Sequence, residues 1–89
     1  KKEGSVSEKI TRLLASSIRK LAGVDIGVGL TGIAGPTGQT KKNPKGTVFI
    51  AIQTKHRDLC WRFLFKGNRD TIRKKASFKA LELIKEILD

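Results

Sequence analysis

Small and hydroxyl-bearing residues fill positions 31–38, which read TGIAGPTG. Successive backbone N–H groups in such a run are not shielded by large side chains and can converge on an anion. Thr31 and Thr37 add hydroxyl groups, and further positive charge follows at Lys41, Lys42 and Lys45. These residue types indicate binding of a phosphate or a similar oxyanion. A surface loop whose glycines only satisfy turn geometry would have the same composition.

A second candidate anion contact is a pair of arginines at the start of a predicted helix. Arg69 and Arg73 are four residues apart, so they share one helix face. The N–H groups and the dipole at a helix N-terminus favour an anion, whereas cations there are locally unfavourable. The pair therefore points to a ligand, and the alternative is a solvated basic face paired with Asp70.

Two further patterns do not lead to a catalytic site. Positions 27–32 match G-x-G-x-x-G, but the pattern lies inside a predicted strand, no helix follows it, and no acidic residue stands about 20 positions later. His56 lies in a polar turn without an evident Ser, Cys or carboxylate partner, and Cys60 is expected to be a packing residue. The chain thus shows no catalytic residues and no metal site, and we expect no cofactor.

Two helices are predicted to flank the candidate residues. The first spans 5–22, with a capping box formed by Ser5 and Glu8 and a stop at Gly23. The second begins after Asn68, which is a good N-cap. Spacings of three and four residues predict the core-facing stripes. These are Val6, Ile10, Leu13, Leu14, Ile18 and Leu21 in the first helix, and Ile72, Ala76, Ala80, Leu83, Ile84 and Ile87 in the second.

Three strands are predicted between the helices. Residues 24–30 alternate between apolar side chains and a bare face with Gly27 and Gly29, which would let another backbone approach closely. A long loop over 31–46 follows. Residues 47–54 are nearly all apolar, as in a central strand covered on both faces, and 59–66 would form a hairpin with them.

The predicted order α-β-β-β-α indicates an α/β fold in which a sheet lies between helices. Three strands with two apolar helices make a thin core, so we expect this sheet to be part of a larger mixed sheet. The chain has 89 residues, which favours a single domain over 1–89. It contains no Met, so we also expect a piece of a longer polypeptide.

The net charge of +11 implies an anionic partner such as a phosphate ligand, a nucleic acid or a membrane surface. No apolar run approaches the ~20 residues of a membrane helix, so a membrane partner is not expected. A basic nucleic-acid-binding module remains an alternative. It is disfavoured because Trp61, Phe63 and Phe65 alternate on one strand face, as core residues do.

Four motifs in order give the chain a family resemblance. They are Val6-Ser7-Glu8, Thr31 to Pro36, Pro44-Lys45-Gly46-Thr47-Val48 and Gly67 to Ala76. The chain resembles the C-terminal domain of the CinA family (competence/damage-inducible protein), whose members include nicotinamide-nucleotide amidases. The resemblance covers the C-terminal half of that domain. The family's E-S-C-T-G-G motif, with its proposed serine nucleophile, does not occur in these 89 residues.

The resemblance implies hydrolysis of nicotinamide mononucleotide to nicotinate mononucleotide and ammonia. It also implies that the reaction takes place in the bacterial cytoplasm. This segment alone would be inactive, because it lacks the family's nucleophile motif. The resemblance further implies a small-molecule pyridine nucleotide as partner and a homo-oligomer. We assign the ligand contacts to Thr31, Gly32, Ala34 and Gly35, with Arg69 and Arg73 as phosphate ligands.

Two positions depart from the family pattern: Asn68 replaces an aspartate, and Gln39 replaces a glycine found in many relatives. Asn68 can cap the helix equally well, but an aspartate that paired with a site arginine would be lost. A CinA-like interaction domain without catalytic activity is therefore a third interpretation.

Overall fold

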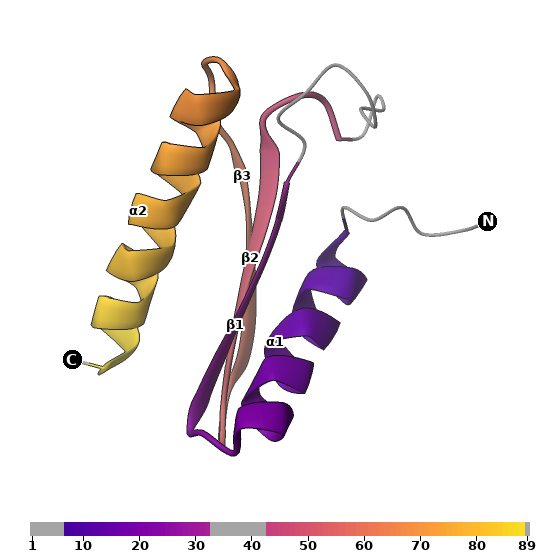
Figure 1. Cartoon of the computed structure of the whole chain (residues 1–89), viewed down its shortest axis with the longest axis vertical. Helices are drawn as coiled ribbons and strands as arrows, with labels where there is room; N and C mark the ends of the chain where they lie inside the picture. Colours follow the sequence, from indigo (N-terminus) through magenta and orange to yellow (C-terminus); the bar gives the residue numbers. More distant parts are fainter. Residues whose placement is uncertain (1–6, 33–42, 89) are drawn as a thin grey trace.

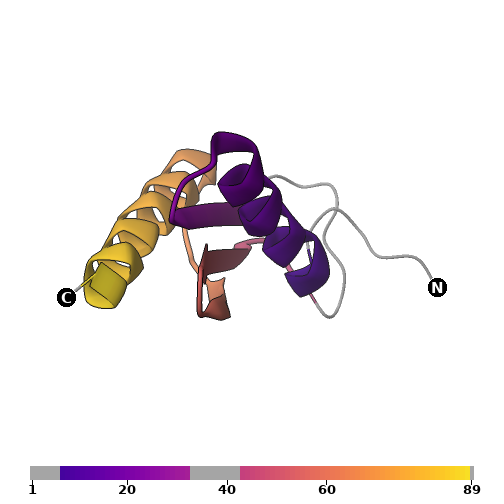
Figure 2. The same cartoon turned by 90° about the horizontal axis from the view of Figure 1, so that it is seen from below.

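The computed structural model describes residues 7–32 and 43–88. In chain order its elements are α1 (Glu8–Ala22), β1 (Ile26–Gly32), β2 (Thr47–Thr54), β3 (Asp58–Leu64) and α2 (Arg69–Leu88). The two helices lie on opposite faces of the sheet, as Figures 1 and 2 show from two directions. The predicted α/β class and element order are confirmed.

The three strands form an antiparallel sheet with β2 in the middle. Every residue of β2 from Thr47 to Ile52 is buried, which confirms the predicted central strand. The hairpin between β2 and β3 is also confirmed. The bounds of the outer strands differ from the prediction. β1 begins at Ile26 and not at residue 24, and β3 spans Asp58–Leu64 and not 59–66. Thr31 and Gly32 belong to β1 and not to the following loop, because they pair with Phe49 and Val48 of β2.

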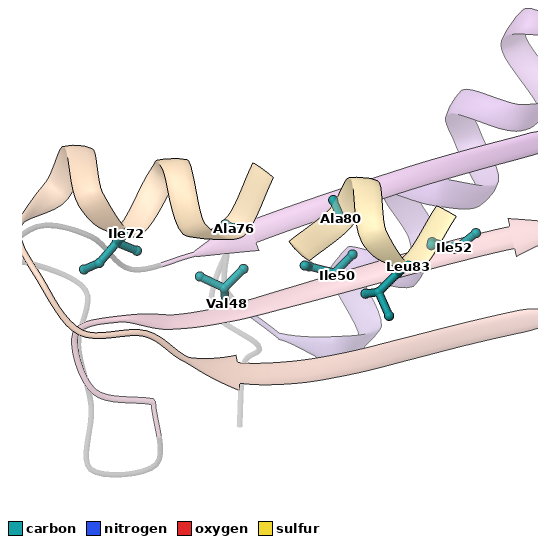
Figure 3. Close-up of a cluster of buried hydrophobic side chains, with 7 residues drawn as sticks. All are labelled: Val48, Ile50, Ile52, Ile72, Ala76, Ala80 and Leu83. Atoms are coloured by element: carbon teal, nitrogen blue, oxygen red, sulfur yellow. The ribbon is translucent and has the colours of Figure 1, made fainter. Parts of the chain in front are cut away.

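The main hydrophobic core lies between β2 and α2. Ile50 and Ile52 are fully buried, and they meet the predicted stripe of α2 (Figure 3). β1 and β3 contribute partly buried side chains to this core, including Trp61 and Phe63. The prediction for the second helix is thus confirmed. The buried cluster consists of Val48, Ile50, Ile52, Ile72, Ala76, Ala80 and Leu83.

The first helix begins later than predicted. Ser7 is its N-cap, since the Ser7 hydroxyl accepts a hydrogen bond from the Ile10 N–H at 3.2 Å. Ser5, the predicted cap, lies outside the described residues, as does Val6. At the other end the predicted stop is confirmed, because Gly23 adopts the left-handed conformation (φ 64°) that ends many helices.

The buried face of α1 also differs from the prediction. Thr11 and Ala15 face the sheet and are 0% exposed. The predicted stripe lies beside this face and is largely exposed, with Leu14 at 40%, Ile18 at 49% and Leu21 at 86%. The apolar periodicity therefore identified a helix but not the side that the sheet covers.

Two glycines of β1 explain this choice of face. A Cβ atom at Gly27 would clash with the Ala15 carbonyl oxygen, and one at Gly29 would clash with the Thr11 carbonyl oxygen. The bare strand face therefore lets the helix backbone itself approach, as predicted. At such a short separation only small side chains fit between helix and strand, which is why Thr11 and Ala15 occupy the contact.

The second helix starts with a side-chain cap that can be tested directly. The Thr71 N–H donates a hydrogen bond to Asn68 Oδ1 at 2.9 Å. We expect Asn68→Ala to lower the free energy of unfolding by about 1 kcal/mol, and Asn68→Asp to change it by less than about 0.5 kcal/mol. Urea unfolding of the three proteins measures both values. A loss in Asn68→Asp as large as that in Asn68→Ala would contradict the capping role.

Candidate functional site

Four chain segments meet at one end of the sheet: β1 and β3 end there, and β2 and α2 begin there (Figure 1). We call this the candidate end. The strand register places Gly32 opposite Val48, and Thr47 opposite Leu64. The predicted ligand residues that the structure describes lie at this end, Thr31 and Gly32 on β1 and Arg69 and Arg73 on α2. Ala34 and Gly35 lie outside the described residues.

The hydroxyl of Thr31 is engaged by the first helix. Thr11 Oγ1 donates its single hydrogen to the Ser7 carbonyl oxygen at 2.6 Å. The 2.7 Å contact between Thr11 Oγ1 and Thr31 Oγ1 must therefore use the hydrogen of Thr31. In this arrangement the Thr31 oxygen can accept a hydrogen bond from a ligand, whereas the contact with an anion that the sequence suggested would require the Thr31 hydroxyl to donate one. That Thr31 contacts a ligand stays a prediction.

The backbone at the start of β2 is held against the end of β3. The Phe65 N–H donates to the Gly46 carbonyl oxygen at 2.9 Å, and both the N–H and the hydroxyl of Thr47 donate to the Pro44 carbonyl oxygen. Gly46 has φ 96°, and a Cβ there would clash with the Phe65 carbonyl oxygen. The P-x-G-T-V motif therefore fixes this turn, which brings Lys45 to the candidate end.

Arg69 and Arg73 occupy the first two turns of α2 and are exposed. The suggested pairing with Asp70 is not observed. Within residues 7–32 and 43–88 no carboxylate lies within ion-pair distance of either arginine. Because the helix dipole disfavours cations at this position, an anion bound there would relieve the repulsion. The structure thus presents two cations at one helix N-terminus.

A pocket of about 280 Å³ lies at the candidate end, and neither Arg69 nor Arg73 is among its lining residues. Leu64, Phe65 and Ile72 form its apolar wall, and Lys45 and Lys66 line it as well. Lys66 was not among the predicted site residues, because a single lysine after a strand carries no spacing signal. Its carbonyl oxygen accepts a hydrogen bond from Lys75 Nζ at 2.8 Å, which holds the turn between β3 and α2.

The remaining reactive side chains do not complete a catalytic set. Cys60 is half-buried in β3, and burial raises the pKa of its thiol, which disfavours the nucleophilic thiolate. His56 lies in the turn between β2 and β3, at the opposite end of the sheet from the start of α2. In the part of the chain that the structure describes, no three His, Cys, Asp or Glu residues gather as metal ligands would.

The aromatic side chains of β3 and of Phe65, which follows it, pack against the core and do not form an exposed stacking surface. Trp61, Phe63 and Phe65 are partly buried against the cluster under α2. The rings of Phe63 and Phe65 stack at 5.6 Å, and Lys79 Nζ lies 5.7 Å from the Phe63 ring centre. The predicted packing of these three side chains against the core is confirmed. A search of the described residues finds no helix that is long and apolar enough to span a bilayer.

Comparison with known proteins identifies the family. Residues 1–88 match the model of the CinA C-terminal domain. The CinA-like protein of Thermotoga maritima is 42% identical over 88 residues, which are 99% of this chain and 21% of that protein. The CinA-like protein of Syntrophus aciditrophicus is 43% identical over 86 residues, which are 96% of this chain and 20% of that protein. The chain therefore spans about a fifth of the length of these curated relatives.

Solved structures show the same architecture. The competence damage-inducible protein A of Klebsiella pneumoniae superposes with a TM-score of 0.87 at 36% identity, covering 94% of this chain and 52% of that one. The competence/damage inducible protein CihA of Agrobacterium tumefaciens gives a TM-score of 0.89 at 26% identity, and the match covers 97% of this chain and 53% of that one. The sequence motifs, the fold and the family match agree: this chain belongs to the CinA C-terminal domain family.

Proposed function

We propose that this chain forms the nucleotide-binding part of an amidohydrolase that converts nicotinamide mononucleotide to nicotinate mononucleotide and ammonia. Membership of the CinA family supports this reaction class. The observation that carries the assignment of a binding part is the candidate end, the end of the sheet at which β1 ends and the basic α2 begins. We expect the reaction to take place in the bacterial cytoplasm, and the homo-oligomer stays a prediction.

The reaction breaks the carboxamide C–N bond, adds the elements of water and releases ammonia. It needs a nucleophile, a group that stabilises the developing oxyanion and an anchor for the 5′-phosphate. In this proposal Arg69 and Arg73 supply the anchor, because guanidinium groups bind phosphate oxygens through paired, charge-assisted hydrogen bonds. The nucleophile belongs to a part of the parent protein outside these 89 residues.

The role proposed for Thr31 follows from its hydrogen-bond geometry. Its hydroxyl hydrogen is committed to Thr11, so its oxygen can accept a hydrogen bond from a donor on the ligand. Nicotinamide mononucleotide carries such donors in its carboxamide N–H groups and ribose hydroxyls. Thr31 would then orient the substrate, whereas the arginines hold its charge. Gly32 is a further ligand contact in the proposal, as are Ala34 and Gly35, which lie outside the described residues.

The test is ammonia release from nicotinamide mononucleotide by the full-length parent protein. We expect activity in the wild type and a kcat/KM about tenfold lower in Arg69→Ala, because a hydrogen bond to a charged group is worth roughly 1.5–3 kcal/mol. Arg57→Ala is the matched control, since Arg57 is an exposed arginine in the turn at the opposite end of the sheet. It should keep wild-type kinetics.

Two results would contradict the proposal. A parent protein that releases no ammonia would favour the interaction domain without catalytic activity. An active parent in which Arg69→Ala matches Arg57→Ala would leave the reaction class intact and overturn the assignment of the phosphate anchor.

A further inference from the structure

A buried hydroxyl group on α1 lies against the end of β1. It belongs to Thr11, which is 0% exposed and is, with Thr47, one of the two polar residues that are fully buried among those the structure describes. A side chain buried in this way does not reach a ligand itself. The Thr11 hydroxyl makes two short hydrogen bonds that connect the start of α1 to Thr31. Thr11 is therefore placed to act on a ligand through Thr31.

The start of α1 fixes the direction of both hydrogen bonds. Ser7 is the N-cap, and its carbonyl oxygen accepts from the Thr11 N–H at 3.1 Å and from the Thr11 hydroxyl at 2.6 Å. A carbonyl oxygen has no hydrogen to give, so the Thr11 hydroxyl donates to it. The Thr11 oxygen can then only accept from Thr31, across the 2.7 Å contact between the two hydroxyl groups. The Thr31 oxygen is left to a ligand as an acceptor alone.

Close packing of α1 on β1 makes this contact possible. Gly29 and Thr31 are two residues apart on one strand, so they face the same side of the sheet. A Cβ atom at Gly29 would clash with the Thr11 carbonyl oxygen, so a larger residue there would displace the helix and Thr11 with it. The direction of the hydrogen bond at Thr31 is thus a consequence of how α1 packs on β1.

We propose that Thr11 is a positioning residue that makes the binding part favour a carboxamide over a carboxylate. This inference rests on the proposed function and names the substrate group that Thr31 contacts. The carboxamide N–H donates to the Thr31 oxygen. After hydrolysis a carboxylate oxygen takes the place of the amide nitrogen, and two acceptors then face each other with no hydrogen between them. Nicotinate mononucleotide is bound less tightly for this reason, which favours its release.

The ribose hydroxyls of the substrate are the alternative partners of Thr31. A hydroxyl can rotate to donate or to accept, so it would bind Thr31 in either direction. An oxygen that only accepts changes the relative affinity of two ligands only where one presents a donor and the other an acceptor. In the proposed reaction the carboxamide is the group that changes in this way. The fixed direction at Thr31 therefore favours the carboxamide as its partner.

The test compares substrate and product on the full-length parent protein. The KM for nicotinamide mononucleotide and the competitive inhibition constant of nicotinate mononucleotide are measured in the wild type and in Thr11→Val, which has a similar shape but no hydroxyl. In this variant the Thr31 hydroxyl is free to donate to the product carboxylate. We expect the ratio of the inhibition constant to KM to fall about tenfold, because a hydrogen bond to a charged group is gained.

Two further variants serve as controls. Thr11→Ser keeps a hydroxyl at the same place and should keep the wild-type ratio. Thr54→Val removes a hydroxyl that accepts from the His56 and Arg57 N–H groups at the opposite end of the sheet, and it should keep the ratio as well. If Thr11→Val does not fold, Thr11→Ala takes its place, because it also lacks the hydroxyl and should lower the ratio in the same direction.

Three results would overturn the inference and leave the proposed function standing. They are an unchanged ratio in the variant without the hydroxyl, an equal fall of the ratio in Thr11→Ser, and weaker binding of substrate and product by the same factor. The last would indicate that Thr11 only supports the structure. A parent protein that releases no ammonia would overturn the proposed function and this inference together.

Discussion

Gly29→Ala is expected to lower the free energy of unfolding by about 3 kcal/mol, which is the upper range for forcing extra atoms into a packed contact. The new Cβ would clash with the Thr11 carbonyl oxygen and lie 2.9 Å from the Ala15 nitrogen. Both atoms are helix backbone, so they cannot move without displacing α1 from the sheet. For 89 residues the total stability is on the order of 4–13 kcal/mol, so the loss is a large fraction of it.

The matched control lies on the same strand. At Gly32 a Cβ would meet Val48 Cγ2 at 3.1 Å and the Thr47 carbonyl oxygen at 3.4 Å, so a shift of a few tenths of an ångström by the Val48 side chain would relieve the contact. Gly32→Ala should therefore cost less than about 1 kcal/mol. Urea unfolding followed by far-ultraviolet circular dichroism measures both variants. Equal losses at the two glycines would contradict the close helix contact as the cause.

Much of the fold could be predicted from local sequence patterns. The alternation in β1, the continuous apolar run of β2 and the spacing of Ile72 to Ile87 each depend on neighbours within one element. The face of α1 could not be predicted in this way. The row from Leu14 to Leu21 has the correct helical period, but the side that packs was decided by Gly27 and Gly29 on another element. Periodicity within one helix contains no information on its partner.

That the residues at the candidate end contact a ligand stays a prediction, and their hydrogen bonds could be predicted only in part. Thr31 and Arg69 lie at the same end of the sheet, because β1 ends and α2 begins there, as the predicted order of elements requires. The direction of the Thr31 hydrogen bond could not be read from sequence, because it depends on Thr11 and Ser7, 20 and more residues away. Lys66 was missed because its place beside the pocket depends on the turn that Lys75 holds.

The second large effect concerns the arginine pair in the full-length parent. Arg69→Ala/Arg73→Ala is expected to lower kcat/KM for nicotinamide mononucleotide by about 10²–10⁴, because two charge-assisted contacts of roughly 1.5–3 kcal/mol each are lost. The loss should appear mainly as a higher KM with kcat little changed, because a phosphate far from the reacting carboxamide is bound equally in the ground state and the transition state.

A control variant with the same change in net charge distinguishes direct contact with the phosphate from long-range electrostatic attraction. Lys55→Ala/Arg57→Ala removes two exposed cations from the turn between β2 and β3, at the other end of the sheet. It should leave KM within about twofold, because exposed charges beyond ~10 Å are screened at moderate salt. An equal rise in KM in the two double variants would mean that substrate binding depends on the overall charge of the protein and not on these two arginines.

The central claim is that Arg69 holds the 5′-phosphate of a pyridine nucleotide at the candidate end. The most direct measurement is a thermodynamic cycle on inhibition constants of the full-length parent, in which one change is Arg69→Ala and the other is removal of the phosphate from the ligand. The two inhibitors are nicotinate mononucleotide and nicotinate riboside, which lacks the phosphate. We expect Arg69→Ala to weaken inhibition by the mononucleotide about tenfold and to leave inhibition by the riboside unchanged. The same loss for both compounds would contradict it.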